Sequence, residues 1–188
     1  MKTKVLGRIL MTALLAGAGV AGAANKQAAS VPATDTDLAK SVRHAVVMYP
    51  YYSIWDDLSF RVDNGSVELM GAVNQPYKKL DIERLVRNLP GVIDVKDEIK
   101  VLPVSFQDDQ LRLRVARAIF RDPMFTRYAI QAVPPIHILV ENGHVTLTGV
   151  VSTQSEKEIA GLRASSAGLS FGPIINNLQV ENPPAKKS

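Results

Sequence analysis

Few side chains in this sequence could do acid–base or nucleophilic chemistry. It has no cysteine, so a thiol nucleophile is excluded. The three histidines, His44, His137 and His144, do not have the spacing of metal ligands, and no aspartate or glutamate cluster accompanies them. The sequence also has no glycine-rich phosphate loop. We therefore predict a protein that is not an enzyme and uses no metal and no cofactor.

A stripe of basic residues is the stronger candidate for a functional surface. If the segment LRLRVARAIFR is helical, Arg114, Arg117 and Arg121 fall within an arc of about 60°. Leu113 and Phe120 flank this stripe on one side. Arginines can reach anionic headgroups while neighbouring apolar side chains enter the membrane interface, so these five residues are candidates for lipid binding. The alternative is a solvated face above an ordinary core stripe.

The only tryptophan lies among tyrosines in the segment YPYYSIWDD. Tyrosine and tryptophan suit both membrane interfaces and protein contacts. Tyr51, Tyr52 and Trp55 are therefore candidates for contact with a membrane or with another protein. The alternative is that these rings cover the end of a hydrophobic core or a contact between domains.

Basic charge elsewhere does not indicate a nucleic-acid partner. Three of the 22 lysines and arginines lie in the first eight residues, and without them 19 basic residues face 18 acidic ones. A second basic segment, with Lys78, Lys79, Arg84 and Arg87, is interrupted by Asp81 and Glu83. Such a mixture is typical of a solvated helical face.

These candidates are positioned by an internal repeat. The phrases NGSVELMGAV and NGHVTLTGVV share the pattern N-G-x-V-x-L-x-G-x-V. Asparagine and glycine both tolerate positive φ, so each phrase predicts a β-hairpin with a two-residue turn. In this register His137 and Thr148 face outward, opposite each other, while Gly71 and Gly149 lie on the inner face. We expect that a glycine there lets a helix approach the sheet.

Helices precede and follow each hairpin. LAKSVRHAVVMYP aligns with LRLRVARAIFRDP, and both carry apolar residues at i, i+4, i+7 and i+8 and end before a proline. The candidates for their N-caps are Thr34, Asp35, Asp37, Asp108 and Asp109. A second helix (residues 76–91 and 152–168) and a last strand (residues 92–101 and 171–180) complete each copy. The predicted fold is therefore α+β, with two tandem α-β-β-α-β domains at residues 35–104 and 105–181. Each domain has a three-stranded mixed sheet with two helices packed on one face.

The two ends of the chain have compositions of their own. A charged start, an apolar run and the small residues Ala21-Gly22-Ala23 predict a signal peptide of residues 1–23, with an uncleaved membrane anchor as the alternative. Residues 24–34 and 182–188 have the composition of a disordered lead-in and tail. Without cysteine no disulfide can form and no lipoprotein anchor is available, so we expect a periplasmic protein.

The repeat resembles the BON domain (bacterial OsmY and nodulation). The resemblance rests on the apolar helix, on N-G-x-V-x-L-x-G-x-V, and on G-V-x-x-V-x-x-x-I-x-V from Gly91 to Val101. It covers nearly all of the chain after the predicted signal peptide, twice. The second copy departs from the pattern in two places: it has extra residues before its hairpin, and Ser170-Phe171 replaces Gly91-Val92.

This resemblance implies a non-enzymatic protein of the bacterial envelope. It implies phospholipid binding and, in the osmotic-stress branch, chaperone-like work. The expected partner is thus an anionic phospholipid membrane, in a role in envelope integrity or osmotic-stress tolerance. The alternative is a periplasmic chaperone or adaptor that binds other envelope proteins through apolar and aromatic surface.

Overall fold

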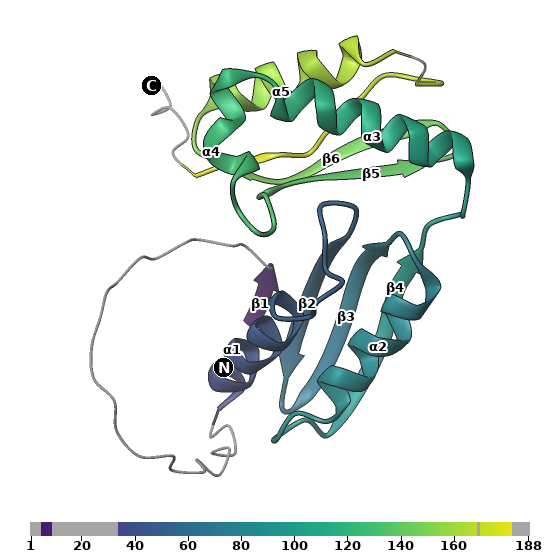
Figure 1. Ribbon diagram of the computed structural model, residues 1–188. Coiled ribbons are helices and arrows are strands. Elements are labelled where there is room, and N and C mark those ends of the chain that lie inside the picture. Colours follow the sequence, from purple (N-terminus) through teal and green to yellow (C-terminus); the bar gives the residue numbers. More distant parts are fainter. Residues whose placement is uncertain (1–4, 9–33, 169, 182–188) are drawn as a thin grey trace, which may run out of the picture.

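The computed structural model describes residues 5–8, 34–168 and 170–181. It contains two α+β domains that follow one another along the chain (Figure 1). Most of the predicted signal peptide, the predicted lead-in before Thr34 and the tail from residue 182 lie outside the described residues.

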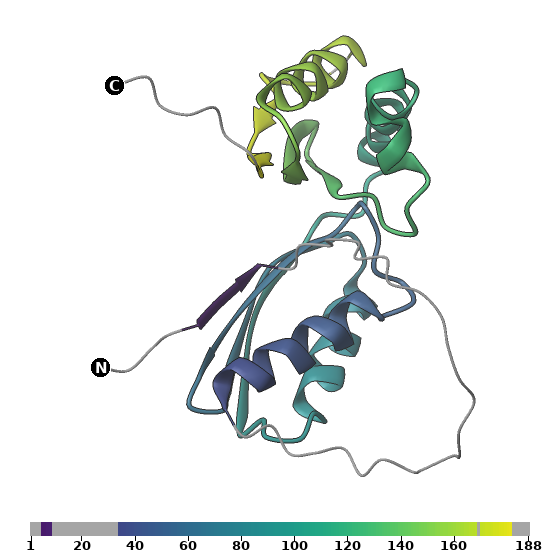
Figure 2. The same cartoon turned by 90° about the vertical axis from the view of Figure 1, so that its left-hand side faces the viewer.

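The first domain packs two helices on one face of a mixed sheet (Figure 2). Its predicted elements are all present: α1 (Asp35–Val47), β2 (Asp57–Asp63), β3 (Ser66–Val73), α2 (Pro76–Arg87) and β4 (Asp94–Val101). Strand β3 pairs antiparallel with β2 and parallel with β4. The apolar stripes of α1 and α2 meet the inner face of the sheet, and the buried core includes Leu38, Val42, Val46, Phe60, Val62, Val67, Leu69, Ile82, Val86 and Ile99.

A fourth strand, β1 (Val5–Arg8), pairs antiparallel with β2 at the edge of this sheet. The sequence did not predict this strand, because its residues belong to the segment assigned to a signal peptide. In a chain without residues 1–23, β2 would be the edge strand.

The second domain repeats the plan with α3 (Phe106–Phe120), β5 (Ile136–Glu141), β6 (His144–Val151) and α5 (Gln154–Ser166). The extra residues before its hairpin fold into η1 (Pro123–Phe125) and α4 (Thr126–Ala129), and they place the buried rings of Phe125 and Tyr128 in the core. The last strand is interrupted: β7 (Ile175–Asn176) and β8 (Gln179–Val180) each pair parallel with β6.

Both hairpins have the predicted register and turn. Val62 lies opposite Val67, and Val140 opposite Val145. The turn residues have positive φ in both copies, with Asn64 at 50° and Asn142 at 51°. The shared phrase is therefore a folding motif, as the pattern predicted.

The predicted role of Gly71 and Gly149 was wrong. A Cβ on Gly71 would lie 2.1 Å from the carbonyl oxygen of Asp57, and one on Gly149 would lie 2.0 Å from that of Pro135. Both glycines have φ above 100°. Each is thus required by a sharp local bend of its own hairpin rather than by the approach of a helix.

The two domains contact each other through the loop between α1 and β2, which reaches the edge of the second sheet (Figure 1). The N–H of Ile138 donates to the carbonyl of Ile54 at 2.7 Å. Lys100 and Glu141 form an ion pair across the same boundary at 2.6 Å. Helices α3 and α5 cover the side of the second sheet that faces away from the first domain, so this contact leaves them uncovered.

Candidate functional site

Helix α3 carries the predicted basic stripe on its outer face. Ser105 caps the helix, where aspartates were predicted: its hydroxyl accepts a hydrogen bond from the N–H of Asp108. The buried side of the helix presents Leu111, Val115 and Ile119 to the second core. Arg117 and Arg121 are exposed, and Arg114 is half-buried. Of the flanking apolar residues, Leu113 is exposed and Phe120 packs partly against the core.

The three stripe arginines have no acidic partner among the described residues. Most basic side chains of the described part form ion pairs instead, among them Arg61, Lys78, Lys79, Arg84, Arg87, Lys96, Lys100, Arg112, Arg127 and Arg163. The stripe is therefore a local concentration of uncompensated positive charge, although the chain as a whole is nearly balanced.

A cavity of about 650 Å³ lies beside the first half of α3. Its lining includes Gln107, Leu111, Arg114, Ser170 and Phe171. The Nε of Arg114 is buried without a hydrogen-bond partner, and Phe171 is 82% exposed. Thus Arg114 borders a hollow that has both apolar and polar walls, while the other two arginines extend the positive charge along the helix.

A buried carboxylate fixes α3 to its hairpin. Asp108 accepts hydrogen bonds from the N–H groups of Asn142 and Gly143, at 2.9 and 2.8 Å. Asp35 does the same for Asn64 and Gly65 in the first domain. The successive N–H groups of a turn with positive φ form a small concave site for an anion. The alignment already placed these two aspartates at equivalent positions, but it could not show that they bind the turn.

Arg112 was not selected from the sequence, yet it is buried and contacts the edge of the second sheet. Its guanidinium donates to the carbonyl of Val140 at 2.6 Å and pairs with Asp109. Ala39 occupies the equivalent position of the first domain. The basic residues of α3 therefore divide into a structural one, Arg112, and the outward-facing stripe.

Each domain has an ion pair beside the end of its hairpin in which the helix residue is buried, and the two pairs have opposite polarity. In the first domain Lys78 pairs with Asp56 at 2.7 Å, and Asp56 also accepts from the N–H of Asn74 at 3.1 Å. Lys78 is only 4% exposed, so the prediction of a solvated face for this helix was wrong at that residue. In the second domain Glu156 occupies the position of Lys78, and it accepts from the N–H of Ser152 at 2.8 Å.

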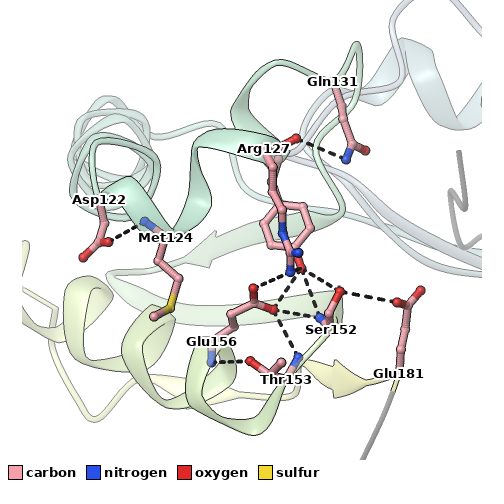
Figure 3. A network of polar contacts seen from close by, with 9 residues as sticks. Asp122, Met124, Arg127, Gln131, Ser152, Thr153, Glu156 and Glu181 are labelled. Carbon is pink, nitrogen blue, oxygen red and sulfur yellow. Dashed lines mark hydrogen bonds and ion pairs between the residues drawn. The ribbon is translucent and has the colours of Figure 1, made fainter.

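Figure 3 shows how the second of these pairs is held. Glu156 is paired with Arg127, accepts a hydrogen bond from the hydroxyl of Tyr128 at 3.0 Å, and accepts another from the N–H of Thr153 at 3.1 Å. Thr153 in turn caps α5. Since these partners satisfy the carboxylate, this network connects the inserted helix α4 to α5 and is not a free site.

The predicted aromatic patch is divided by the domain contact. Tyr52 is buried, and its ring lies 5.7 Å from that of His137. Trp55 is half-buried and packs against the second core. Tyr51 alone of the three is well exposed, with Tyr77 beside it. The three rings therefore do not form one exposed surface, and two of them lie at the domain contact that the sequence left as the alternative.

The prediction that the side chains of His137 and Thr148 face outward is also wrong, because the domain contact covers them. Both side chains are buried, although their cross-strand pairing is as predicted. Burial lowers the pKa of His137 below its usual value, while the nearby carboxylates of Asp57 and Asp56 oppose this effect.

Two features of other functional classes are not found in the described part of the chain. No group of histidine, aspartate and glutamate there could hold a metal ion. No helix among the described residues is long and apolar enough to cross a membrane.

A family model for the BON domain matches the chain twice, at residues 34–103 and 107–182. The chain belongs to the BON domain family. Its α-β-β-α-β units are therefore BON domains in tandem, as the resemblance predicted. BON domains are generally non-enzymatic and are associated with the bacterial envelope and with phospholipid binding.

Two solved structures of CdsD, a structural protein of the type III secretion system of Chlamydia trachomatis, are similar to this chain. The C-terminal domain of CdsD is 18% identical over 77% of this chain and 65% of its own length, with a TM-score of 0.31. A second CdsD structure is 21% identical over 77% of this chain and 61% of its own, with a TM-score of 0.30. The chain thus spans less than two thirds of either structure. No curated protein matches it.

Proposed function

We propose that this tandem BON protein binds anionic phospholipid surfaces in the periplasm, through the outer face of α3, and so contributes to envelope integrity or osmotic-stress tolerance. The observation that carries the proposal is the stripe of Arg114, Arg117 and Arg121, which has no acidic partner among the described residues and belongs to α3, a helix on the side of the second domain away from the first (Figure 1). Leu113 and Phe120 give the stripe an apolar border. Near an anionic surface each basic residue contributes about 1 kcal/mol before screening by salt.

Arg117 and Arg121 are the residues to change, because both are exposed and neither has a structural partner among the described residues. Arg117→Glu with Arg121→Glu should weaken binding to vesicles that contain phosphatidylglycerol by about 30-fold or more, since roughly 2 kcal/mol of attraction is lost. Co-sedimentation at low and high salt measures this effect.

Arg84→Glu with Arg87→Glu on α2 is the matched control, because it changes the net charge equally at arginines that already have acidic partners. We expect the control to bind vesicles nearly as well as the parent protein. Equal loss in both variants would show that net charge, and not the α3 face, determines binding. Failure of the parent protein to bind anionic vesicles at low salt would overturn the proposal.

A second candidate function is that of a periplasmic adaptor or chaperone. It is favoured by exposed apolar and aromatic side chains around a groove of about 500 Å³ between α1 and α2, which include Met48, Tyr51, Tyr77 and Leu85. If this surface holds other proteins, the purified protein should suppress the aggregation of an unfolded client. Tyr51→Ser with Leu85→Ser should remove that effect without unfolding the domain, whereas the α3 variant should keep it.

A further inference from the structure

The two sheets differ in how their outer edges are protected. In a hairpin with a two-residue turn, the residues that flank the turn bond to each other, and outward-pointing backbone groups then recur at every second residue. In the second domain the outward groups belong to Ile138 and Val140. In the first domain they belong to Phe60 and Val62, which occupy the equivalent positions.

The edge of β5 is blocked by two contacts from within the chain. The N–H of Ile138 donates to the carbonyl of Ile54, which lies in the loop from the first domain. The carbonyl of Val140 accepts from Arg112. Unpaired edges invite pairing with other chains, and native proteins cover them in this way.

The edge of β2 lacks a side-chain donor equivalent to Arg112. Asp35 fixes α1 to its hairpin turn as Asp108 fixes α3, so Ala39 lies where Arg112 lies. Alanine has no donor for the carbonyl of Val62. What covers this edge is β1, with Val5 opposite Val62 and Gly7 opposite Phe60.

We propose that, once residues 1–23 are removed, the edge of β2 binds an extended segment of another polypeptide, added as an antiparallel strand in the place of β1. Such a strand is recognised by its backbone N–H and C=O groups, so the partner is an unfolded or extended peptide with little sequence preference. The chain itself shows the mode on β2, where it seats one extended segment, while the equivalent edge of β5 is capped by a single backbone hydrogen bond to the turn at Ile54. This site is separate from the α3 face and does not depend on lipid binding.

The experiment uses the chain of residues 24–188. This truncation keeps every core residue whose burial the structure describes, from Leu38 onward. The probe is a synthetic peptide of residues 3–10, TKVLGRIL. Amide hydrogen exchange at Phe60 and Val62 should slow by about tenfold or more when the peptide is added. The amide of Ile138, already bonded to Ile54, should not change, and in the full chain both β2 amides should be slow without peptide.

Two variants test the assignment to this edge. Thr36→Asp with Ala39→Arg transfers the Asp109–Arg112 pair to the first domain and should weaken peptide binding by about tenfold, whereas Ala39→Met adds bulk without the donor and should bind like the parent. A peptide with proline in place of Gly7 should not bind, since it lacks the N–H that pairs at Phe60.

Three results would overturn the proposal. The first is unchanged exchange at both amides in the presence of millimolar peptide. The second is equal peptide binding by the two Ala39 variants. The third is slow exchange in the truncated chain before any peptide is added, together with a dimeric mass, because a second copy would then occupy the edge.

Discussion

Asp35 and Asp108 have the same backbone partners, but Asp108 is only 2% exposed while Asp35 is partly open to water. A carboxylate that accepts two N–H bonds away from solvent contributes more than one whose bonds compete with water. The same hydrogen bonds between helix and turn therefore contribute more to the stability of the second domain than to that of the first. Both aspartates precede an apolar helical stripe, and this position alone suggested helix caps.

We predict that Asp108→Asn destabilises the protein by about 1.5–3 kcal/mol, because the amide presents a donor to one of the two turn N–H groups. Asp35→Asn should cost less. Urea unfolding of both variants measures the difference. A loss at Asp35 equal to or larger than that at Asp108 would contradict the stated role of burial.

Within single elements, the hairpins and α3 depend on backbone features that side-chain patterns do not report. The bend at Gly71 lets both Ala72 and Val73 be buried, where strict alternation would bury only one of them. The alternation that correctly places Val67, Leu69 and Val73 in the core therefore fails at Gly71, which is exposed, and at Ala72, which is buried. In α3, helical periodicity located the buried stripe but not the inward turn of Arg112.

We predict that Gly71→Ala and Gly149→Ala each destabilise their hairpin by about 2 kcal/mol or more, since a Cβ would meet a carbonyl oxygen in a strained backbone conformation. Gly168→Ala is the matched control: it also has positive φ, but a Cβ there would meet nothing within 4 Å. Thermal unfolding compares the three variants. A smaller loss at Gly71 than at Gly168 would refute the assignment of a steric role.

For the whole molecule, the domain contact determines which candidate surfaces can be used. It buries Tyr52 and His137 and covers part of Trp55, and it leaves α3 with its arginines on the far side (Figure 1). Val133, from the loop before β5, packs against the first core, so each domain supplies a loop to the other. The two domains are thus packed together rather than joined only by their linker.

This arrangement predicts a pH dependence. Burial depresses the pKa of His137, so above about pH 6.5 the histidine is neutral in the folded and unfolded states alike. As pH falls below that value the unfolded chain binds a proton that the folded protein does not accept, and stability is lost until the folded pKa is reached. His137→Gln should remove this loss, so its free energy of unfolding should fall less than that of the parent between pH 7.5 and 5. Parallel profiles for the two proteins would disprove this account.

The sequence by itself determined the tandem α-β-β-α-β fold, the hairpin register and the family. These follow from local rules: Asn-Gly fixes the turn, and alternation and helical periodicity fix the buried faces. It also located the arginine stripe, because the spacing of Arg114, Arg117 and Arg121 is a property of one helix.

Only the tertiary structure decided what meets those faces. Strand β1, the inverted ion pairs of Lys78 and Glu156, and the burial of Tyr52 join residues that are far apart in the chain, and no local period records such contacts. Burial depends on what another part of the chain covers. For that reason the sequence could propose two surfaces, and the packing of one domain on the other left the basic one open.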